Sequence, residues 1–328
     1  MAKKILILRF SSIGDIVLTT PVLRCIKTQM PEVEIHYATK KQYASILSSN
    51  PYIAKLHLFE NKRLPVLMDD LAKEKFDLII DLHNNLRTFL IKNNLNIASS
   101  SFRKINFQKW MMVKFKINRL PDKHIVDRYL ETASELGIVN DGLGLDFFIH
   151  ENDQVQINSL PQVFQNGYIA VVIGALHFTK KIPNEKIIEL CRQINRPVIL
   201  IGGKEDFENG EFISASGENI LNACGKYSIG QSASLLQQSI KVFTHDTGMM
   251  HIAAAFKKDI ISVWGNTIPE FGMYPYYGNQ RNLEQQRIEN KILEMKGLYC
   301  RPCSKIGFEK CPQGHFKCMM EIRFDSVN

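Results

Sequence analysis

The sequence predicts an α/β fold made of two doubly wound, Rossmann-like domains that face each other across a cleft. Short apolar runs, typical of parallel strands covered on both faces, alternate with helical segments along most of the chain. A polar stretch at 139–162 interrupts this series and is the best candidate for a linker. The 328 residues suffice for two domains that each bury a core. We therefore expect one domain at 1–160 and a second at 161–328.

Each half of the chain contains its own βαβ series. In the first half, a strand at 3–10 precedes a helix from Asp15 to Met30, and an amphipathic helix at 124–138 ends the series. Further strands are expected at 33–39, 53–59 and 76–83. In the second half, strands are expected at 167–175, 196–203, 220–225, 241–246 and 259–265, with helices at 184–194, 232–239 and 247–256. Ligands of such sheets bind at the carboxyl ends of the strands, so we expect the active site between the domains.

Composition narrows the class of protein. The hydrophobic fraction of 45% and the charged fraction of 23% are ordinary for a globular protein. The formal charge of +8 suggests an anionic partner such as nucleic acid, a phosphorylated substrate or an acidic membrane face. No signature of an RNA-binding module is present, so we expect no nucleic acid partner. The apolar part of the N-terminus is too short for a signal peptide, and we expect a cytoplasmic protein.

The segment "FTHDTGMMHIAAA" at 243–255 predicts a phosphate site. Asp246 ends a strand, and Thr247 and Gly248 open a helix whose first N–H groups bind a diphosphate well. His251 lies one turn further on, where its ring can reach the same ligand. From the residues alone, a plain helix cap by Asp246 or Thr247 remains the alternative.

Two neighbouring strand ends strengthen this interpretation. Thr179, Lys180 and Lys181 follow one strand, and Glu205 follows another. A cation and a hydroxyl suit phosphates, whereas a carboxylate suits ribose or sugar hydroxyls. The set predicts a nucleotide-diphosphate site without the Walker or GxGxxG sequence. We expect Lys180 rather than Lys181 to contact phosphate.

The first half offers three candidate features. "RFSSIGDIVLTTPVL" at 9–23 has one glycine, Gly14, at a strand-to-helix turn, followed by Asp15, which from sequence alone is equally a helix cap. Arg87 in "DLHNNLRT" either holds an acceptor phosphate or is a surface arginine. The stretch 101–128 carries eight Lys and Arg residues among aromatic residues. It is either a contact surface for phosphates or anionic lipid headgroups, or a solvated face.

Together these pieces resemble glycosyltransferase family 9, the lipopolysaccharide heptosyltransferases, along almost the whole chain. The matching segments are the opening motif, "FDLIIDLHNNLRT" at 76–88, the Thr-Lys-x-x-Pro segment at 179–183, "HDTGMMHIAAA" at 245–255 and the tail "CRPCSKIGFEKCPQGHFKCM". The resemblance implies a GT-B fold and inverting sugar transfer, with no cofactor required, from an ADP-sugar such as ADP-heptose. It also implies a lipid-linked or lipopolysaccharide core acceptor and a peripheral place on the inner face of the cytoplasmic membrane.

The resemblance also implies roles for individual residues. Asp15 is the expected general base on the acceptor side, and Lys180 with the amides of Thr247 and Gly248 stabilises the departing diphosphate. The expected donor site consists of Thr179, Lys180, Glu205, Asp246, Thr247, Gly248 and His251. The expected acceptor site consists of Ser12, Gly14, Arg87, Lys109, Lys114 and Lys116.

The tail raises the question of a metal. Cys300, Cys303, Cys311 and Cys318 have a spacing compatible with zinc. A reduced, buried or partly disulfide-linked cluster is the favoured alternative, and we expect the tail to cross back to the first domain. Two other functions compete with sugar transfer, namely a nucleotide-sugar epimerase and a glycan-binding protein without turnover.

Overall fold

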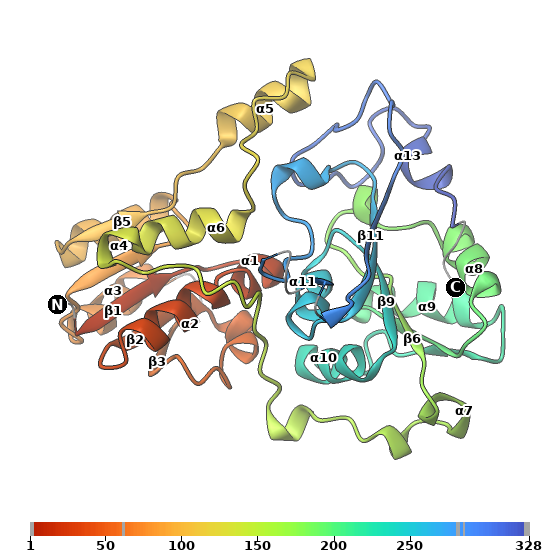
Figure 1. Cartoon of the computed structure of the whole chain (residues 1–328), viewed down its shortest axis with the longest axis horizontal. Coiled ribbons are helices and arrows are strands. Elements are labelled where there is room, and N and C mark those ends of the chain that lie inside the picture. Colours follow the sequence, from red (N-terminus) through yellow and green to blue (C-terminus); the bar gives the residue numbers. More distant parts are fainter. Residues whose placement is uncertain (1–2, 61–62, 280–282, 285, 325–328) are drawn as a thin grey trace.

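Two α/β domains lie side by side (Figure 1). The structure is a computed structural model that describes residues 3–60, 63–279, 283–284 and 286–324. Each domain is centred on a sheet in which every strand pair is parallel. The predicted pair of doubly wound domains is therefore confirmed. Among the described residues, none of the helices combines the length and apolarity needed to cross a membrane.

The first sheet has the order β3-β2-β1-β4-β5. Its strands are β1 (Lys4–Leu8), β2 (Glu34–Lys40), β3 (Lys55–Phe59), β4 (Leu78–Asp81) and β5 (Ser99–Ser101). The helices of this domain are α1 (Ile13–Val17), α2 (Thr20–Gln29), α3 (Leu64–Ala72), α4 (Leu86–Leu95), α5 (Asn106–Phe115) and α6 (Ile125–Leu130). The last four residues of the central β1 are fully buried, as a continuous apolar run predicts.

The second sheet has the order β11-β10-β9-β6-β7-β8. Its strands are β6 (Ile169–Val172), β7 (Val198–Ile201), β8 (Ile220–Asn222), β9 (Lys241–His245), β10 (Asp259–Trp264) and β11 (Asn290–Glu294). The helices are α7 (Gln162–Gln165), α8 (Asn184–Gln193), α9 (Phe207–Ser214), α10 (Ile229–Gln238), α11 (Gly248–Ala255) and α13 (Lys317–Met320).

The helix predicted from Asp15 to Met30 is two helices in the structure. The first ends at Val17, and α2 starts at Thr20 with Pro21 in its first turn. Proline has no N–H to continue a preceding helix but fits the first turn of a new one. The break turns the chain directly after the Gly14-Asp15 motif, so that α1 is a short element at the edge of the cleft.

The second half of the chain contacts the first domain again at two places, in the segment after β10 and in the tail. At the segment after β10, the Ile125 N–H donates to the carbonyl of Gly272 at 2.8 Å, and the Tyr276 hydroxyl donates to Asp127 at 2.9 Å. The tail packs on the second domain, with Phe316, Met319 and Phe324 in its core. The tail also contacts the first domain, because Lys116 Nζ donates to the carbonyls of Cys300 and Pro302.

Candidate active site

A cavity of about 840 Å³ opens between the two domains at the carboxyl ends of both sheets. The first domain lines it with the turn after β1, the start of α5 and part of α6. The second domain lines it with the segments that follow β6, β7 and β9. This is the location expected for a ligand of two facing parallel sheets.

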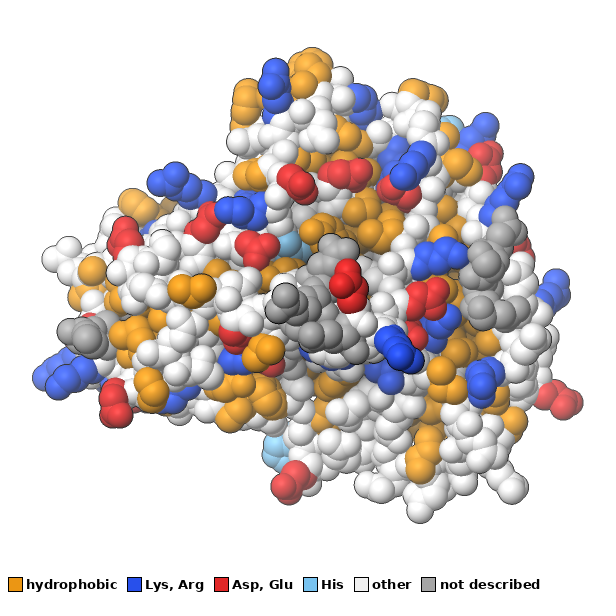
Figure 2. All heavy atoms as spheres, viewed as in Figure 1, with side chains coloured by type: hydrophobic (Ala, Val, Ile, Leu, Met, Phe, Trp, Pro, Cys, Tyr) orange, Lys and Arg blue, Asp and Glu red, His pale blue; other side chains and the backbone are white. Residues whose placement is uncertain are grey.

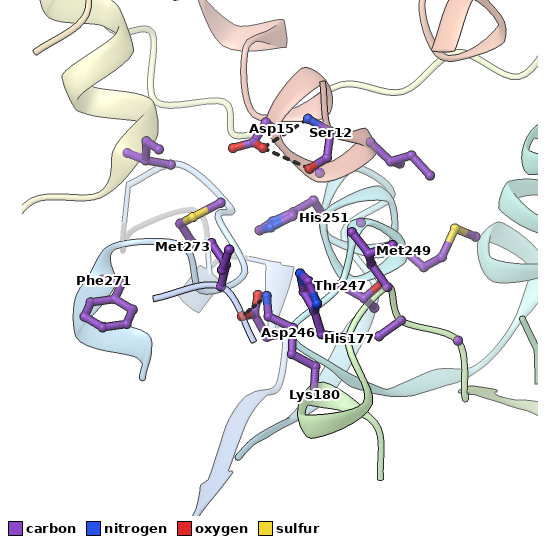
Figure 3. A pocket seen from close by; sticks show the side chains of 18 of the residues that line it. Ser12, Asp15, His177, Lys180, Asp246, Thr247, Met249, His251, Phe271 and Met273 are labelled. Carbon is purple, nitrogen blue, oxygen red and sulfur yellow. Dashed lines mark hydrogen bonds and ion pairs between the residues drawn. The ribbon is translucent and has the colours of Figure 1, made fainter. Parts of the chain in front are cut away.

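Asp15 projects into the cavity from α1 and is held on both carboxylate oxygens (Figure 3). Oδ1 pairs with Nη2 of Arg9 at 2.7 Å, while Oδ2 accepts from the backbone N–H and the hydroxyl of Ser12 at 3.1 and 2.9 Å. Arg9 is itself fixed, because its Nη1 donates to the carbonyl of Leu82 and to the hydroxyl of Tyr129.

These contacts determine the ionisation of Asp15. Burial alone would raise the pKa of its carboxyl group, but the Arg9 guanidinium and the Ser12 hydrogen bonds outweigh burial and lower that pKa. Asp15 is therefore ionised at neutral pH and oriented toward the cavity. Such a carboxylate accepts a proton only from a group that becomes acidic during the reaction, as a hydroxyl does when its oxygen forms a new bond.

The amino end of α11 faces Asp15 from the second domain (Figure 3). Thr247 occupies the position before the helix, and its side chain caps none of the helix N–H groups. The first N–H groups of α11 thus remain available for an anionic ligand.

An ion pair lies beside this helix start. Lys180 Nζ is 2.6 Å from Oδ2 of Asp246, which also accepts from the Thr267 hydroxyl at 2.9 Å. Burial would raise the pKa of Asp246, but Lys180 and Thr267 more than compensate and lower it. Asp246 therefore stays charged and holds the Lys180 ammonium group at the cavity wall.

His251 lies between the two carboxylates, with Asp15 on one side and Asp246 on the other (Figure 3). The side chain is buried, and within the part of the chain that the structure describes its Nδ1 atom has no hydrogen-bond partner. Burial lowers the pKa of His251 to about 4. The ring is therefore neutral at pH 7 and can serve a ligand as a hydrogen-bonding group rather than as a charge.

The sequence model of glycosyltransferase family 9 (heptosyltransferase) matches residues 66–298, more than half of the chain. The chain belongs to this family. It is 22% identical to lipopolysaccharide heptosyltransferase 1 of Campylobacter coli over 80% of this chain and 84% of that protein.

Solved structures show the same fold. The Escherichia coli ADP-heptose lipopolysaccharide heptosyltransferase II superposes with a TM-score of 0.71 at 20% identity, covering 96% of each chain. The E. coli heptosyltransferase WaaC, solved with ADP, has a TM-score of 0.65 at 20% identity, covering 85% of this chain and 91% of that one. The predicted GT-B architecture is confirmed, and the family is one of glycosyltransferases, which disfavours the epimerase and binding-protein alternatives.

Most of the family 9 residues expected from the sequence line the cavity. From the second domain they are Lys180, Glu205, Asp246, Thr247, Gly248 and His251, and from the first domain they are Ser12, Gly14, Asp15 and Lys109. Thr179 does not belong to the lining. Its buried hydroxyl accepts from the N–H of Phe308 at 2.8 Å and so attaches the tail to the second domain.

Three expected acceptor residues point elsewhere. The Arg87 guanidinium stacks on the rings of Phe10 and Phe59, with centroids 5.0 and 4.5 Å away. Lys116 Nζ donates to the carbonyls of Cys300 and Pro302 in the tail. Lys114 is exposed on α5 and does not line the cavity.

Other basic residues line the cavity in their place. The cavity lining includes Arg9, Lys104, Arg128 and Lys305. Arg9 belongs to the same sequence motif as Asp15, so the sequence could have indicated that Arg9 lies at the site. Lys104 and Arg128 belong to the basic stretch but had no feature that distinguished them from its other members. Lys305 comes from the tail, and nothing in the local sequence indicates its long-range placement.

The cysteines of the tail are all unpaired. Sγ of Cys300 lies 3.8 Å from Nε2 of His315. Among the described residues, one group of three ligating side chains converges within 4.8 Å, and it consists of His36, His57 and Glu74 rather than the cysteines. That group lies near the amino-terminal ends of β2 and β3, at the edge of the sheet opposite the cavity.

Proposed function

We propose that this protein transfers a heptose from ADP-heptose to a lipopolysaccharide core or other lipid-linked acceptor with inversion of configuration, using Asp15 as the general base. The observation that carries the proposal is that an ionised carboxylate and a free helix amino end face each other across one cavity. The named relatives are lipopolysaccharide heptosyltransferases, and one of them was solved with ADP. The cavity in this chain offers matching groups on both sides.

The second domain is the proposed donor site. The N–H groups at the start of α11 and the Lys180 ammonium group bind the diphosphate. The Glu205 carboxylate lies against Gly203, within 2.6 Å of where a Cβ would stand, and suits the ribose hydroxyls. Apolar side chains of Ile201 and Ile229 line the adjoining part of the cavity and suit the base.

The reaction then proceeds in one displacement. The acceptor hydroxyl oxygen attacks the anomeric carbon while the bond from that carbon to the diphosphate oxygen breaks, and its electron pair leaves with ADP. Asp15 takes the hydroxyl proton, and a base positioned in this way contributes about 10²–10⁴-fold to the rate. Lys180 and the amides of α11 stabilise the charge that develops on the diphosphate.

The acceptor side is basic, which suits an acceptor that carries phosphate or carboxylate groups. Lys104, Lys109 and Arg128 line it together. Lys109 is partly buried, and burial lowers the pKa of its ammonium group to about 8. It therefore remains mostly protonated at pH 7 but is sensitive to mild alkali. An acceptor of this kind belongs to the inner face of the cytoplasmic membrane, where we place the enzyme as a peripheral protein.

The experiment that tests the proposal is an ADP-release assay with purified enzyme. We expect rapid release of ADP only when ADP-heptose and a heptose-deficient lipopolysaccharide acceptor are both present. The new glycosidic bond should have the anomeric configuration opposite to that of the donor. UDP-sugars serve as the control donor. Equal turnover with UDP-sugars, or retention of the donor's configuration, would contradict the assignment.

A further inference from the structure

Helix α5 projects from the first domain, away from both sheets (Figure 1). None of its ten residues is buried. Phe107, Trp110 and Phe115 are exposed over 66%, 51% and 54% of their surface. Helices this short are marginal in water without packing, and soluble proteins rarely expose clustered aromatic side chains without a partner.

The three aromatic side chains form one continuous patch. The rings of Phe107 and Trp110 stack with centroids 5.8 Å apart, and Trp110 meets Phe115 edge-on at 5.2 Å. Residues three or four apart lie on the same face of a helix, and Phe107 and Trp110 have this spacing. We name these three residues the aromatic face of α5.

Basic residues lie on α5 and on both sides of it in the sequence. Lys114 lies on the helix itself, and the exposed Arg103 and Arg119 lie just before and after it. Hydrophobic and basic side chains occur together on the projecting part of the molecule at the top of Figure 2. Tryptophan flanked by lysine and arginine favours the interface of a bilayer with anionic headgroups, where the ring and the charges both find partners.

The same helix also reaches the proposed active site. Ile105, Asn106 and Lys109, at its start and first turns, line the cavity, and the Lys109 ammonium group lies 5.1 Å from the ring centroid of Phe271 in the second domain. A bilayer in contact with α5 would therefore lie next to the mouth of the cavity. This would let a lipid-linked acceptor present its sugar to Asp15 without leaving the membrane.

We propose that α5 is a membrane anchor that seats Phe107, Trp110 and Phe115 in the interface of an anionic bilayer. The proposal rests on the proposed function for the identity of the acceptor, but its binding step is independent of catalysis. It also restricts the surface expected from the sequence, because Lys109 faces the cavity and Lys116 is bonded to tail carbonyls.

The chain itself provides the probe. It contains two tryptophans, and Trp264 is only 1% exposed, so Trp110 reports on α5. On addition of phosphatidylglycerol-containing vesicles, we expect a blue shift of tryptophan emission and protection from acrylamide. The shift should be absent in Trp110→Phe, which keeps an aromatic ring and should still bind. Vesicles that bind the protein without changing Trp110 emission would overturn the proposal.

A triple variant measures the contribution of the face. Phe107→Ser/Trp110→Ser/Phe115→Ser should lower the affinity for anionic vesicles by about tenfold or more, because each side chain loses apolar burial in the interface. The matched control is Phe212→Ser, which removes an aromatic side chain that is 59% exposed on α9. Equal loss in both variants, or no loss in the triple variant, would contradict an anchor on α5.

Two further outcomes distinguish membrane binding by α5 from the catalytic proposal and from dimerisation. Transfer to a delipidated, water-soluble acceptor should be unchanged in the triple variant, so a failure of the catalytic proposal would appear in that assay and not in vesicle binding. A dimer that shields Trp110 from acrylamide in the absence of lipid, and dissociates in the triple variant, would show that a second copy covers the face and would overturn the membrane assignment.

Discussion

Gly14 and Gly248 bring the two domains into close backbone contact in the wall of the cavity. A Cβ atom on Gly14 would lie 3.2 Å from Cα of Gly248 and 2.7 Å from Cδ2 of His251. A Cβ atom on Gly248 would lie 3.0 Å from the Gly14 nitrogen and 2.7 Å from a methyl carbon of Ile13. The two glycines therefore allow α1, which carries Asp15, to approach the amino end of α11.

Substitution of either glycine should separate the base from the donor. We expect Gly14→Ala and Gly248→Ala each to lower kcat by about 100-fold, since a displacement of roughly 1 Å has such effects on positioned groups. ADP affinity should change little, because alanine keeps the backbone N–H groups. Steady-state kinetics and calorimetry with ADP measure both quantities. Gly217→Ala is the control, because its Cβ would meet the ends of two side chains and no backbone atom, Asn219 Oδ1 at 3.1 Å and Ile220 Cδ1 at 3.5 Å. Full activity in both cleft variants would refute the role of this contact.

The ion pair between Lys180 and Asp246 makes a second prediction. Lys180→Ala should weaken ADP binding by about 10- to 100-fold, the loss expected for a hydrogen bond to a charged group. It also leaves the Asp246 carboxylate unpaired and facing the diphosphate. Adding Asp246→Asn should therefore restore part of the lost affinity.

Calorimetry on the two single variants and the double variant measures this coupling. Lys226→Ala, which changes a lysine of the second domain outside the cavity lining, should leave ADP affinity unchanged. If the double variant binds ADP more weakly than Lys180→Ala alone, Asp246 contributes to binding in some other way than by holding Lys180.

The ionisation of Lys109 leads to a prediction for the pH dependence of the acceptor's kcat/KM. Its pKa is lowered to about 8 by burial, so the free enzyme loses this positive charge as the pH rises through that value. The acceptor's kcat/KM should fall on the alkaline side of about pH 8, because this ratio reports ionisation of the free enzyme. In Lys109→Arg the alkaline fall should disappear, since arginine keeps its charge. An identical fall in that variant would assign the transition to another group.

The local sequence was sufficient for the elements that form the site. Continuous apolar runs identified β1, β6 and β7, and the single glycine before Asp15 marked the turn that presents the carboxylate. The edge strands β5 and β11 were missed, because "SSS" and "NKILE" have no continuous apolar run. At the edge of a sheet, backbone pairing forms a strand that side-chain patterning does not indicate.

The errors in the site have a common physical cause. Thr179 contacts Phe308, and Lys116 contacts Cys300 and Pro302, more than a hundred residues further along the chain. Composition shows that a stretch is basic, but not which of its side chains point inward. The separation of Lys109 from Lys114 and Lys116 became visible only when the position of α5 relative to the second domain was known.

The role of Asp15 is tested most directly by the turnover of Asp15→Asn with saturating donor and acceptor. Asparagine keeps the size of the side chain but cannot take the acceptor proton. The account predicts that kcat falls by about 10²–10⁴-fold, while the affinity for ADP stays near that of the unaltered enzyme. The thermal midpoint of unfolding should fall, because asparagine leaves the buried Arg9 guanidinium without its charged partner. A kcat close to that of the unaltered enzyme would contradict the assignment of Asp15 as the general base.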